Sequence, residues 1–274
     1  MKTILVATDY SAPAENAVEF AAQLAKTIGA ELTLFNVYKM NIHASNSFSS
    51  LAHIEKMKKQ NADELSAHAI KIGDKYGVQT SSETGEIDTV ESLKQYTKSH
   101  PVDLVVMGIE SNLTEYKLFG NTTTEAIKLM QFPLLVVPND IKFEGIKKIT
   151  YACETSYLNE NCRLDVLKEF VKACQADLEV LHVVTDHSEN PKNEALEELI
   201  NTMLNDLQHH FRYVSNSKIG EGIETGLEEF GANLLVMVPH KMGFFESMTK
   251  GSQTSKMTVR TRLPLLVIPN TSIC

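Results

Sequence analysis

The sequence predicts an α/β protein in which two similar domains follow one another, each built around a five-stranded parallel sheet. Apolar runs of strand length alternate with amphipathic segments of helix length, a pattern typical of parallel strands that helices cover on both faces. The second half of the chain repeats the first. With 274 residues, of which 43% are hydrophobic, the chain is long enough to form two cores of ordinary size.

The repeat defines the domain organisation. The matching segments are FPLLVVPN (132–139) with LPLLVIPN (263–270), KTILVATDYS (2–11) with KKITYACETS (147–156), and AELTLFNVY (30–38) with ADLEVLHVV (176–184). We therefore expect a first domain at 1–140 and a second at 141–274, with the seam near the charged segment DIKFEGIKK. Each half is expected to hold five strands and about four helices.

The elements of the first half follow from periodicity and from helix start and stop signals. TILVAT reads as a strand, and the next helix has Ser11 as its cap, Pro13 in its first turn and Gly29 as its stop. The remaining segments are expected to be the strand LTLFNVY, a helix at 51–76, a weaker strand at 78–84, a helix at 89–99, the strand DLVVMG, a helix from Thr122 and the strand PLLVVP.

The loop from Gly108 to Thr122 is the strongest indication of a ligand. It starts at the carboxyl end of a strand, where open parallel sheets bind their ligands, and Asp9 ends the first strand at the same edge. The helix that follows Gly120 would point its free amides and its positive dipole end toward this crevice, which favours an anion. Glycine lets a backbone come close to phosphate oxygens.

Several motifs of the chain resemble those of the universal stress protein family. These are ATD near the start, MG-x-x-S at the fourth strand, GNTT before a helix and PLLVVP at the end, and their recurrence resembles the tandem form of the family. The resemblance implies a Rossmann-like, adenine nucleotide alpha hydrolase-like fold and pairing of the two domains through their last strands as an internal pseudo-dimer. It also implies ATP or a related adenine nucleotide as a ligand, bound in one subclass through a G-x2-G-x9-G-[ST] loop.

Carried over position by position, the resemblance places Asp9 at the ribose or adenine, Val37 against the base, and Met107 with Gly108 at the ribose-phosphate link. The cofactor-binding residues that it implies are Ala7, Thr8, Asp9, Val37, Met107, Gly108, Ser111, Gly120, Asn121 and Thr122. The chain departs from the motif because Ser111 replaces the second glycine, eight residues separate it from Gly120, and Asn121 replaces Ser or Thr.

Two structural explanations of the same residues stay open. Thr122 and Glu125 form a capping box, which a helix can use whether or not a ligand binds. Asp9 lies two residues before Ser11 and could simply help the first helix begin.

The second half departs further from the nucleotide motif. Pro239 replaces Gly108 and has no N–H to donate, Met242 replaces the next glycine, and Glu154 replaces Asp9. We expect this half to act mainly as the pairing partner of the first. His182 takes the place of Asn36, which predicts a hydrogen-bonded interior position, and GEGIETG (220–226) is interpreted as a strand-to-helix turn.

The resemblance implies a non-catalytic stress-response protein that binds an adenine nucleotide; the alternative is a nucleotide-free scaffold or interaction module of the same family. The sequence lacks G-x4-G-K-[ST], G-x-S-x-G and H-E-x-x-H, so we expect no catalytic residues and no metal site. A net charge of −9 disfavours nucleic acid as a partner. The four cysteines form no C-x-x-C pair, which favours buried free thiols over a disulfide or a metal site.

The location and the assembly are further expectations. No apolar run approaches the roughly 20 residues that cross a bilayer, and no secretory signal opens the sequence, so we expect a cytoplasmic protein without a membrane contact. The protein partners are unknown, and the pairing of whole chains into a homodimer stays open.

Overall fold

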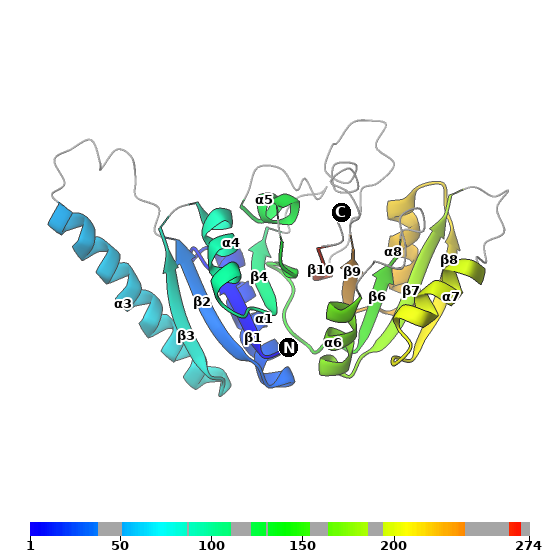
Figure 1. Ribbon diagram of the computed structural model, residues 1–274, viewed down its shortest axis with the longest axis horizontal. Coiled ribbons are helices and arrows are strands. Elements are labelled where there is room, and N and C mark those ends of the chain that lie inside the picture. The colour runs from blue at the N-terminus through cyan, green and yellow to red at the C-terminus, as the bar shows by residue number, and fades with distance from the viewer. Residues whose placement is uncertain are drawn as a thin grey trace.

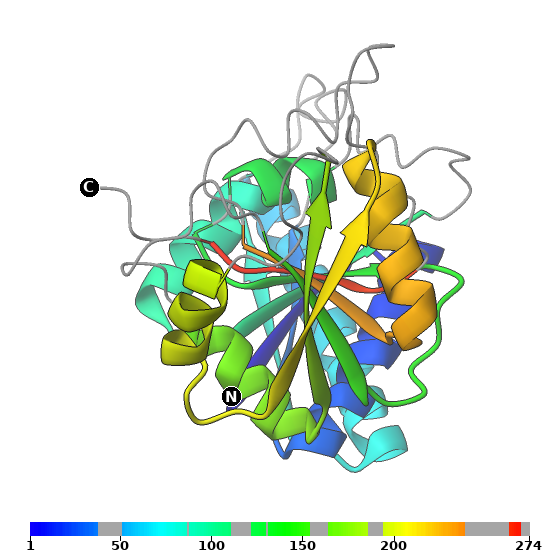
Figure 2. The same ribbon diagram turned by 90° about the vertical axis from the view of Figure 1, so that its right-hand side faces the viewer.

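The residues that the structure describes form one continuous sheet of ten strands with helices packed on both faces (Figure 1). The computed structural model describes residues 1–37, 51–86, 88–110, 122–129, 131–153, 164–185, 194–238 and 263–269. Viewed from the second half, the strands fan out with the twist usual in parallel sheets (Figure 2).

Five strands come from each half of the chain. Those of the first half are β1 (Thr3–Ala7), β2 (Glu31–Val37), β3 (Thr80–Gly85), β4 (Leu104–Ile109) and β5 (Leu134–Pro138). Those of the second half are β6 (Lys148–Ala152), β7 (Asp177–Val184), β8 (His209–Ser215), β9 (Leu234–Met237) and β10 (Leu265–Val267). The order across the sheet is β3-β2-β1-β4-β5-β10-β9-β6-β7-β8, so each half has the same internal order.

The two halves join through the repeated apolar strands. β5 and β10 pair antiparallel, with Leu135 opposite Leu266, whereas the other neighbouring strands of the sheet pair parallel. The predicted internal pairing of two five-stranded parallel sheets is therefore confirmed. Both apolar cores also continue across this junction, because each contains residues from both halves.

The helices divide between the two faces of the sheet. One face carries α1 (Ala12–Ile28), α3 (Leu51–Tyr76), α6 (Asp165–Cys174) and α7 (Glu194–Met203), and the other carries α4 (Thr89–Ser99), α5 (Thr122–Leu129) and α8 (Ile219–Phe230). The first half shows the four predicted helices, and the described residues of the second half show three. Among the described residues, no helix is both long enough and apolar enough to span a membrane.

The start of α1 differs in one detail from the prediction. Pro13 lies in the first turn, and Gly29 ends the helix with a left-handed φ of 71°, as expected. Ser11 occupies the cap position, but its side chain makes no capping hydrogen bond. Instead, the Ser11 N–H donates to Asp9 Oδ1 at 3.0 Å, so the aspartate orders the turn that leads into the helix.

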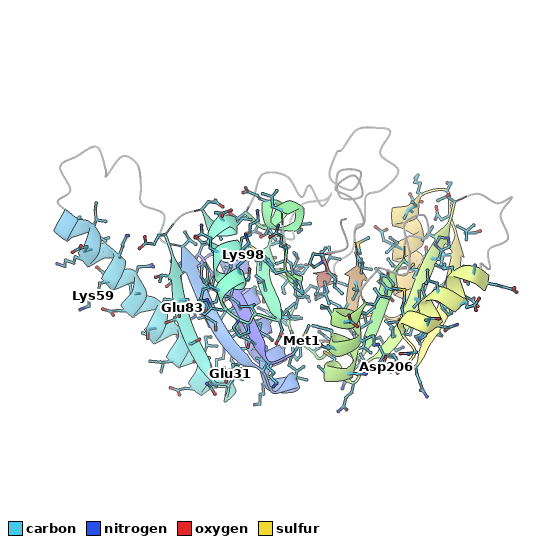
Figure 3. The ribbon with its side chains drawn as sticks, viewed as in Figure 1. Met1, Glu31, Lys59, Glu83, Lys98 and Asp206 are labelled. Carbon is cyan, nitrogen blue, oxygen red and sulfur yellow. The ribbon has the colours of Figure 1, made fainter. Side chains whose placement is uncertain are left out.

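The segment between the halves is fastened to α1. The side-chain amide of Asn16, which is 6% exposed, donates to the carbonyl oxygens of Pro138 and Ile141 at 2.9 Å each, and its own oxygen accepts from Lys142 Nζ at 2.7 Å. Close by, Phe143 packs edge-on against Phe20 with ring centroids 5.0 Å apart. α1 and α6 contact each other, and the amino group of Met1, which Figure 3 labels, lies 3.4 Å from Glu169 Oε2. The connection is therefore part of the packed structure.

α1 comes unusually close to β4. A Cβ added at Gly108 would lie 2.1 Å from the Pro13 carbonyl oxygen and 2.4 Å from its carbonyl carbon. Because both are backbone atoms, neither can rotate out of the way. The glycine is thus required by the contact between the helix and the strand, whatever binds at this edge of the sheet.

Replacing Asn16 tests whether its buried side-chain amide holds the segment between the two halves against α1. We expect Asn16→Ala to lower the free energy of unfolding by about 1–3 kcal/mol, because two carbonyl oxygens lose their donor. Urea unfolding of the full chain measures the change, with Lys26→Ala on the exposed side of α1 as the control. Equal stability of both variants would contradict the role given to Asn16.

Adding a methyl group at Gly108 tests the contact between α1 and β4. We expect Gly108→Ala to lower the free energy of unfolding by at least about 1–3 kcal/mol, because the backbones must separate to make room for the Cβ. The exposed change Lys98→Ala on α4 should stay within about 0.5 kcal/mol of the parent chain. A Gly108→Ala chain as stable as its parent would show that α1 can move away at no cost.

Candidate functional site

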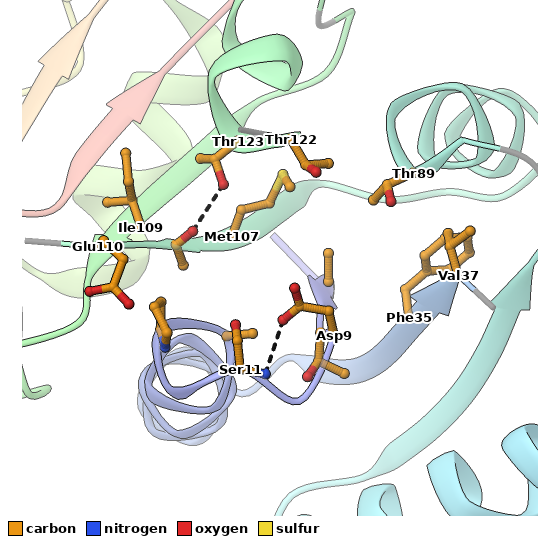
Figure 4. Close-up of a pocket in the computed structure, with 15 residues that line it drawn as sticks. Asp9, Ser11, Phe35, Val37, Thr89, Met107, Ile109, Glu110, Thr122 and Thr123 are labelled. Atoms are coloured by element: carbon orange, nitrogen blue, oxygen red, sulfur yellow. Dashed lines mark hydrogen bonds between the residues drawn. The ribbon is translucent and has the colours of Figure 1, made fainter. Parts of the chain in front are cut away.

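A pocket of about 340 Å³ opens at the carboxyl ends of β1, β2 and β4 (Figure 4). It lies between the first turn of α1, the start of α4 and the start of α5. This is the edge of the sheet at which ligands are expected in parallel α/β folds. β1 lies between β2 and β4 in the sheet, so the crevice coincides with the point where the chain reverses the direction in which it adds strands.

Seven sequence-predicted residues line this pocket, and three lie outside the described residues. The lining residues are Ala7, Thr8, Asp9, Val37, Met107, Gly108 and Thr122. The predictions that the structure does not describe are Ser111, Gly120 and Asn121. Four separate segments of the chain therefore meet at one place.

The sequence analysis missed eight further residues of the lining. They are Ser11, Pro13, Ala14, Phe35, Thr89, Ile109, Glu110 and Thr123. The alternation of side chains along a strand could have identified Phe35, two residues before Val37, and Ile109, two residues after Met107. No sequence signal pointed to Thr89, which reaches the pocket only because α4 begins beside it.

The floor of the pocket is apolar. Ala7, Phe35, Met107 and Ile109 belong to the buried core on the α4 and α5 face, and Val37 is half-buried at its border. The flat ring of Phe35 and the thioether of Met107 suit the apolar face of a planar ligand such as a nucleobase.

The turn from β1 to α1 forms the polar wall of the pocket. Thr8 is buried, its hydroxyl donates to Glu15 Oε1 at 3.0 Å, and its carbonyl oxygen accepts from the Asn36 side chain at 2.7 Å. Tyr10 adopts a left-handed φ of 64°, and its N–H donates to the Thr8 hydroxyl at 3.0 Å. These bonds fix the backbone that carries Asp9, whose carboxylate lies at the pocket (Figure 4).

Helix α3 supports the same turn from outside the pocket. His68 Nε2 lies 3.2 Å from the Glu15 carboxylate, and the His68 ring lies 5.9 Å from the Tyr10 ring. Partial burial raises the pKa of the Tyr10 hydroxyl, and the carboxylates of Glu64 and Glu15 raise this pKa further. The phenol is therefore neutral around pH 7.

Three helices begin at the pocket, and two of their amino ends already hold a carboxylate of the chain. Asp88 caps α4 by accepting from the N–H groups of Val90 and Glu91. Asp9 accepts from Ser11 at the start of α1. At α5, the Thr123 hydroxyl donates to the Gly108 carbonyl oxygen at 2.9 Å, which ties this helix to β4 (Figure 4).

The matching edge of the second half keeps part of this framework. The N–H of Cys153 donates to the Leu181 carbonyl oxygen at 2.9 Å, as the Thr8 N–H does to Phe35. His182 Nδ1 lies 3.3 Å from the Cys153 carbonyl oxygen, which confirms the predicted hydrogen bond of a residue that is half-buried. The diverged positions Glu154, Pro239 and Met242 lie outside the described residues.

Neither a metal site nor a disulfide emerges from the part of the chain that the structure describes. No group of three or more His, Cys, Asp or Glu side chains that could hold a metal gathers there. Cys153 and Cys174 are buried free thiols, and burial raises the pKa of the Cys174 thiol to about 12. Cys162 and Cys274 lie outside the described residues.

Comparisons with known proteins agree with this architecture. A universal stress protein from Archaeoglobus fulgidus DSM 4304 has a TM-score of 0.73 at 18% identity, covering 98% of both chains. A functionally unknown protein from Pseudomonas aeruginosa PAO1 has a TM-score of 0.51 at 11% identity, covering 98% of this chain and 92% of that one. At such identities these likenesses show the fold alone.

A comparison of the sequence with protein-family models identifies the family. No curated protein matches the chain. The sequence model described as the universal stress protein family matches residues 1–138, which is half of the chain. The chain belongs to the universal stress protein family.

Proposed function

We propose that the first half binds an adenine nucleotide, ATP or a relative, in this pocket, as a regulatory ligand that is not turned over. The observation that carries the proposal is the convergence of seven residues, predicted from four separate segments, on one pocket. The apolar floor offers a surface for the base, and Asp9 offers a carboxylate for the ribose hydroxyls or the adenine amino group.

The absence of turnover is part of the proposal. Phosphoryl transfer needs positive charge close to the transferred group, supplied by Lys, Arg or a metal ion. The described lining residues hold the carboxylates of Asp9 and Glu110 and no Lys, Arg, His or Cys. Binding of the nucleotide would then act by stabilising the turn from β1 to α1 and the helices that begin at the pocket.

We also propose the tandem form of the family, with domains at 1–140 and 141–274 and a second half that serves mainly as a pairing partner. The same strand order in both halves and the β5–β10 pairing support this division. So does the fastening of the connection, since Asn16 holds the backbone on both sides of residue 140.

Substitutions at Asp9 test the site. We expect Asp9→Ala to weaken the binding of AMP to the full chain by about 1–3 kcal/mol, because the ligand loses a charged hydrogen-bond acceptor. Asp9→Asn keeps an oxygen that can accept from Ser11, so it separates the loss of charge from the loss of the turn. Isothermal titration calorimetry measures all three chains.

The matched control is Asp63→Ala, which removes an exposed carboxylate from α3. The control should bind AMP like the parent chain. If both Asp9 variants also bind like the parent, Asp9 does not contact the ligand. If the parent binds no adenine nucleotide, a nucleotide-free scaffold becomes the better account.

A further inference from the structure

We infer that this pocket selects against polyphosphates and takes an adenine ligand with at most one phosphate, and that Glu110 is the main residue that sets this preference. The inference rests on the proposed function and narrows its ligand class. It follows from the charges around the pocket, from the position of Glu110 and from the state of the helix ends.

The described lining of the pocket is acidic. Asp9 approaches from the end of β1 and Glu110 from the end of β4 (Figure 4). No Lys, Arg or His belongs to the described lining. Among the described lining residues, a bound phosphate chain would therefore meet two carboxylates and no cationic side chain.

Glu110 is held at the mouth of the pocket. It directly follows β4, and the Asn139 side-chain amide donates to its Oε2 at 2.9 Å. The Asn139 backbone N–H donates to the Ile109 carbonyl oxygen at 2.9 Å, so the residue that holds Glu110 is itself attached to the end of β4. The Asn139 side chain thus holds the carboxylate of an exposed residue that lines the pocket.

Two of the three helix ends at the pocket, those of α4 and α1, are already engaged by carboxylates of the chain. The first free N–H groups of α4 donate to Asp88 at 2.8 and 3.4 Å, and the N–H that leads into α1 donates to Asp9 at 3.0 Å. Helix amino ends bind anions through such N–H groups together with the positive end of the dipole. Here carboxylates occupy part of this capacity before any ligand arrives.

These charges act differently on different adenine ligands. Adenosine is uncharged, and a single phosphate carries about −1.5 to −2 at pH 7. A triphosphate adds further ionised groups, and the carboxylates of Asp9 and Glu110 repel each of them, because charges within a screening length of about 10 Å at 0.1 M salt still interact. The apolar floor contacts the base equally in all three ligands, so the phosphates decide the order of affinity.

The test is a calorimetric titration of the full chain with adenosine, AMP and ATP, in EDTA and at constant ionic strength. We expect adenosine and AMP to bind more tightly than ATP, with the dissociation constant of ATP larger by about tenfold or more. Glu110→Gln keeps the shape of the side chain and should strengthen ATP binding by about three- to tenfold. The same variant should leave the binding of adenosine within about twofold of the parent chain.

The matched control is Glu228→Gln, which removes the same charge from an exposed position of α8 in the second half. It should change none of the three affinities. The dependence of the affinities on ionic strength is a second test. When the ionic strength rises from about 0.02 to 0.2 M, screening should strengthen the binding of ATP relative to that of adenosine. A site that attracts phosphates would show the opposite trend.

The outcomes separate the inference from the proposed function. If ATP binds more tightly than adenosine and Glu110→Gln does not strengthen ATP binding, the inference is wrong and the adenine site stands. If none of the three ligands binds, the proposed function fails and the inference fails with it. If the ligands follow the expected order but Glu228→Gln acts like Glu110→Gln, the overall charge of the protein causes the preference and Glu110 does not.

Discussion

The contact between two backbones at Gly108 holds the candidate site together. The absence of a Cβ lets the Pro13 carbonyl of α1 lie directly against β4, and the Thr123 hydroxyl of α5 donates to the carbonyl oxygen of the same glycine. One residue thus positions two helices that begin at the pocket. The turn that carries Asp9 is fixed by bonds to Thr8, which places an acidic group beside an apolar floor.

The second half packs against the half that carries the pocket. Both cores run through the β5–β10 junction, so the first half is packed against the second over both faces of the sheet. The outer strands have diverged strongly in their polar contacts. In the first half Thr33 pairs with Ser81 at 2.9 Å, whereas in the second half the fully buried carboxylate of Glu179 accepts from Arg212, which also bonds Glu229.

Much of the architecture could be predicted because several independent sequence patterns indicated the same fold. Continuous apolar strands gave the parallel sheet, and the repeat of PLLVVP as PLLVIP pointed to the junction of the halves. GEGIETG was wrongly interpreted as a turn, since it lies inside α8. Gly222 and Gly226 instead allow the helix to pack closely on Val183 and Leu181 of β7, which a single sequence does not distinguish from turn glycines.

The site was predictable only in outline. The family resemblance predicted seven of the residues that line the pocket. The alternation of side chains along β2 and β4 would have predicted Phe35 and Ile109 as well. Glu110 was missed because the contact that holds its carboxylate comes from the Asn139 side chain, which follows β5 and is distant in the sequence. The contact of Gly108 with α1 likewise depends on tertiary packing, which no local pattern of residues encodes.

The most direct test of the account is to map the amide resonances of the full chain during titration with AMP. If the pocket binds AMP, we expect saturable shifts at Ala7–Asp9, Val37 and Met107–Ile109, with the amides of β6–β8 unchanged. Shifts that concentrate on the second half, or saturating AMP that leaves the first-half amides unmoved, would contradict it.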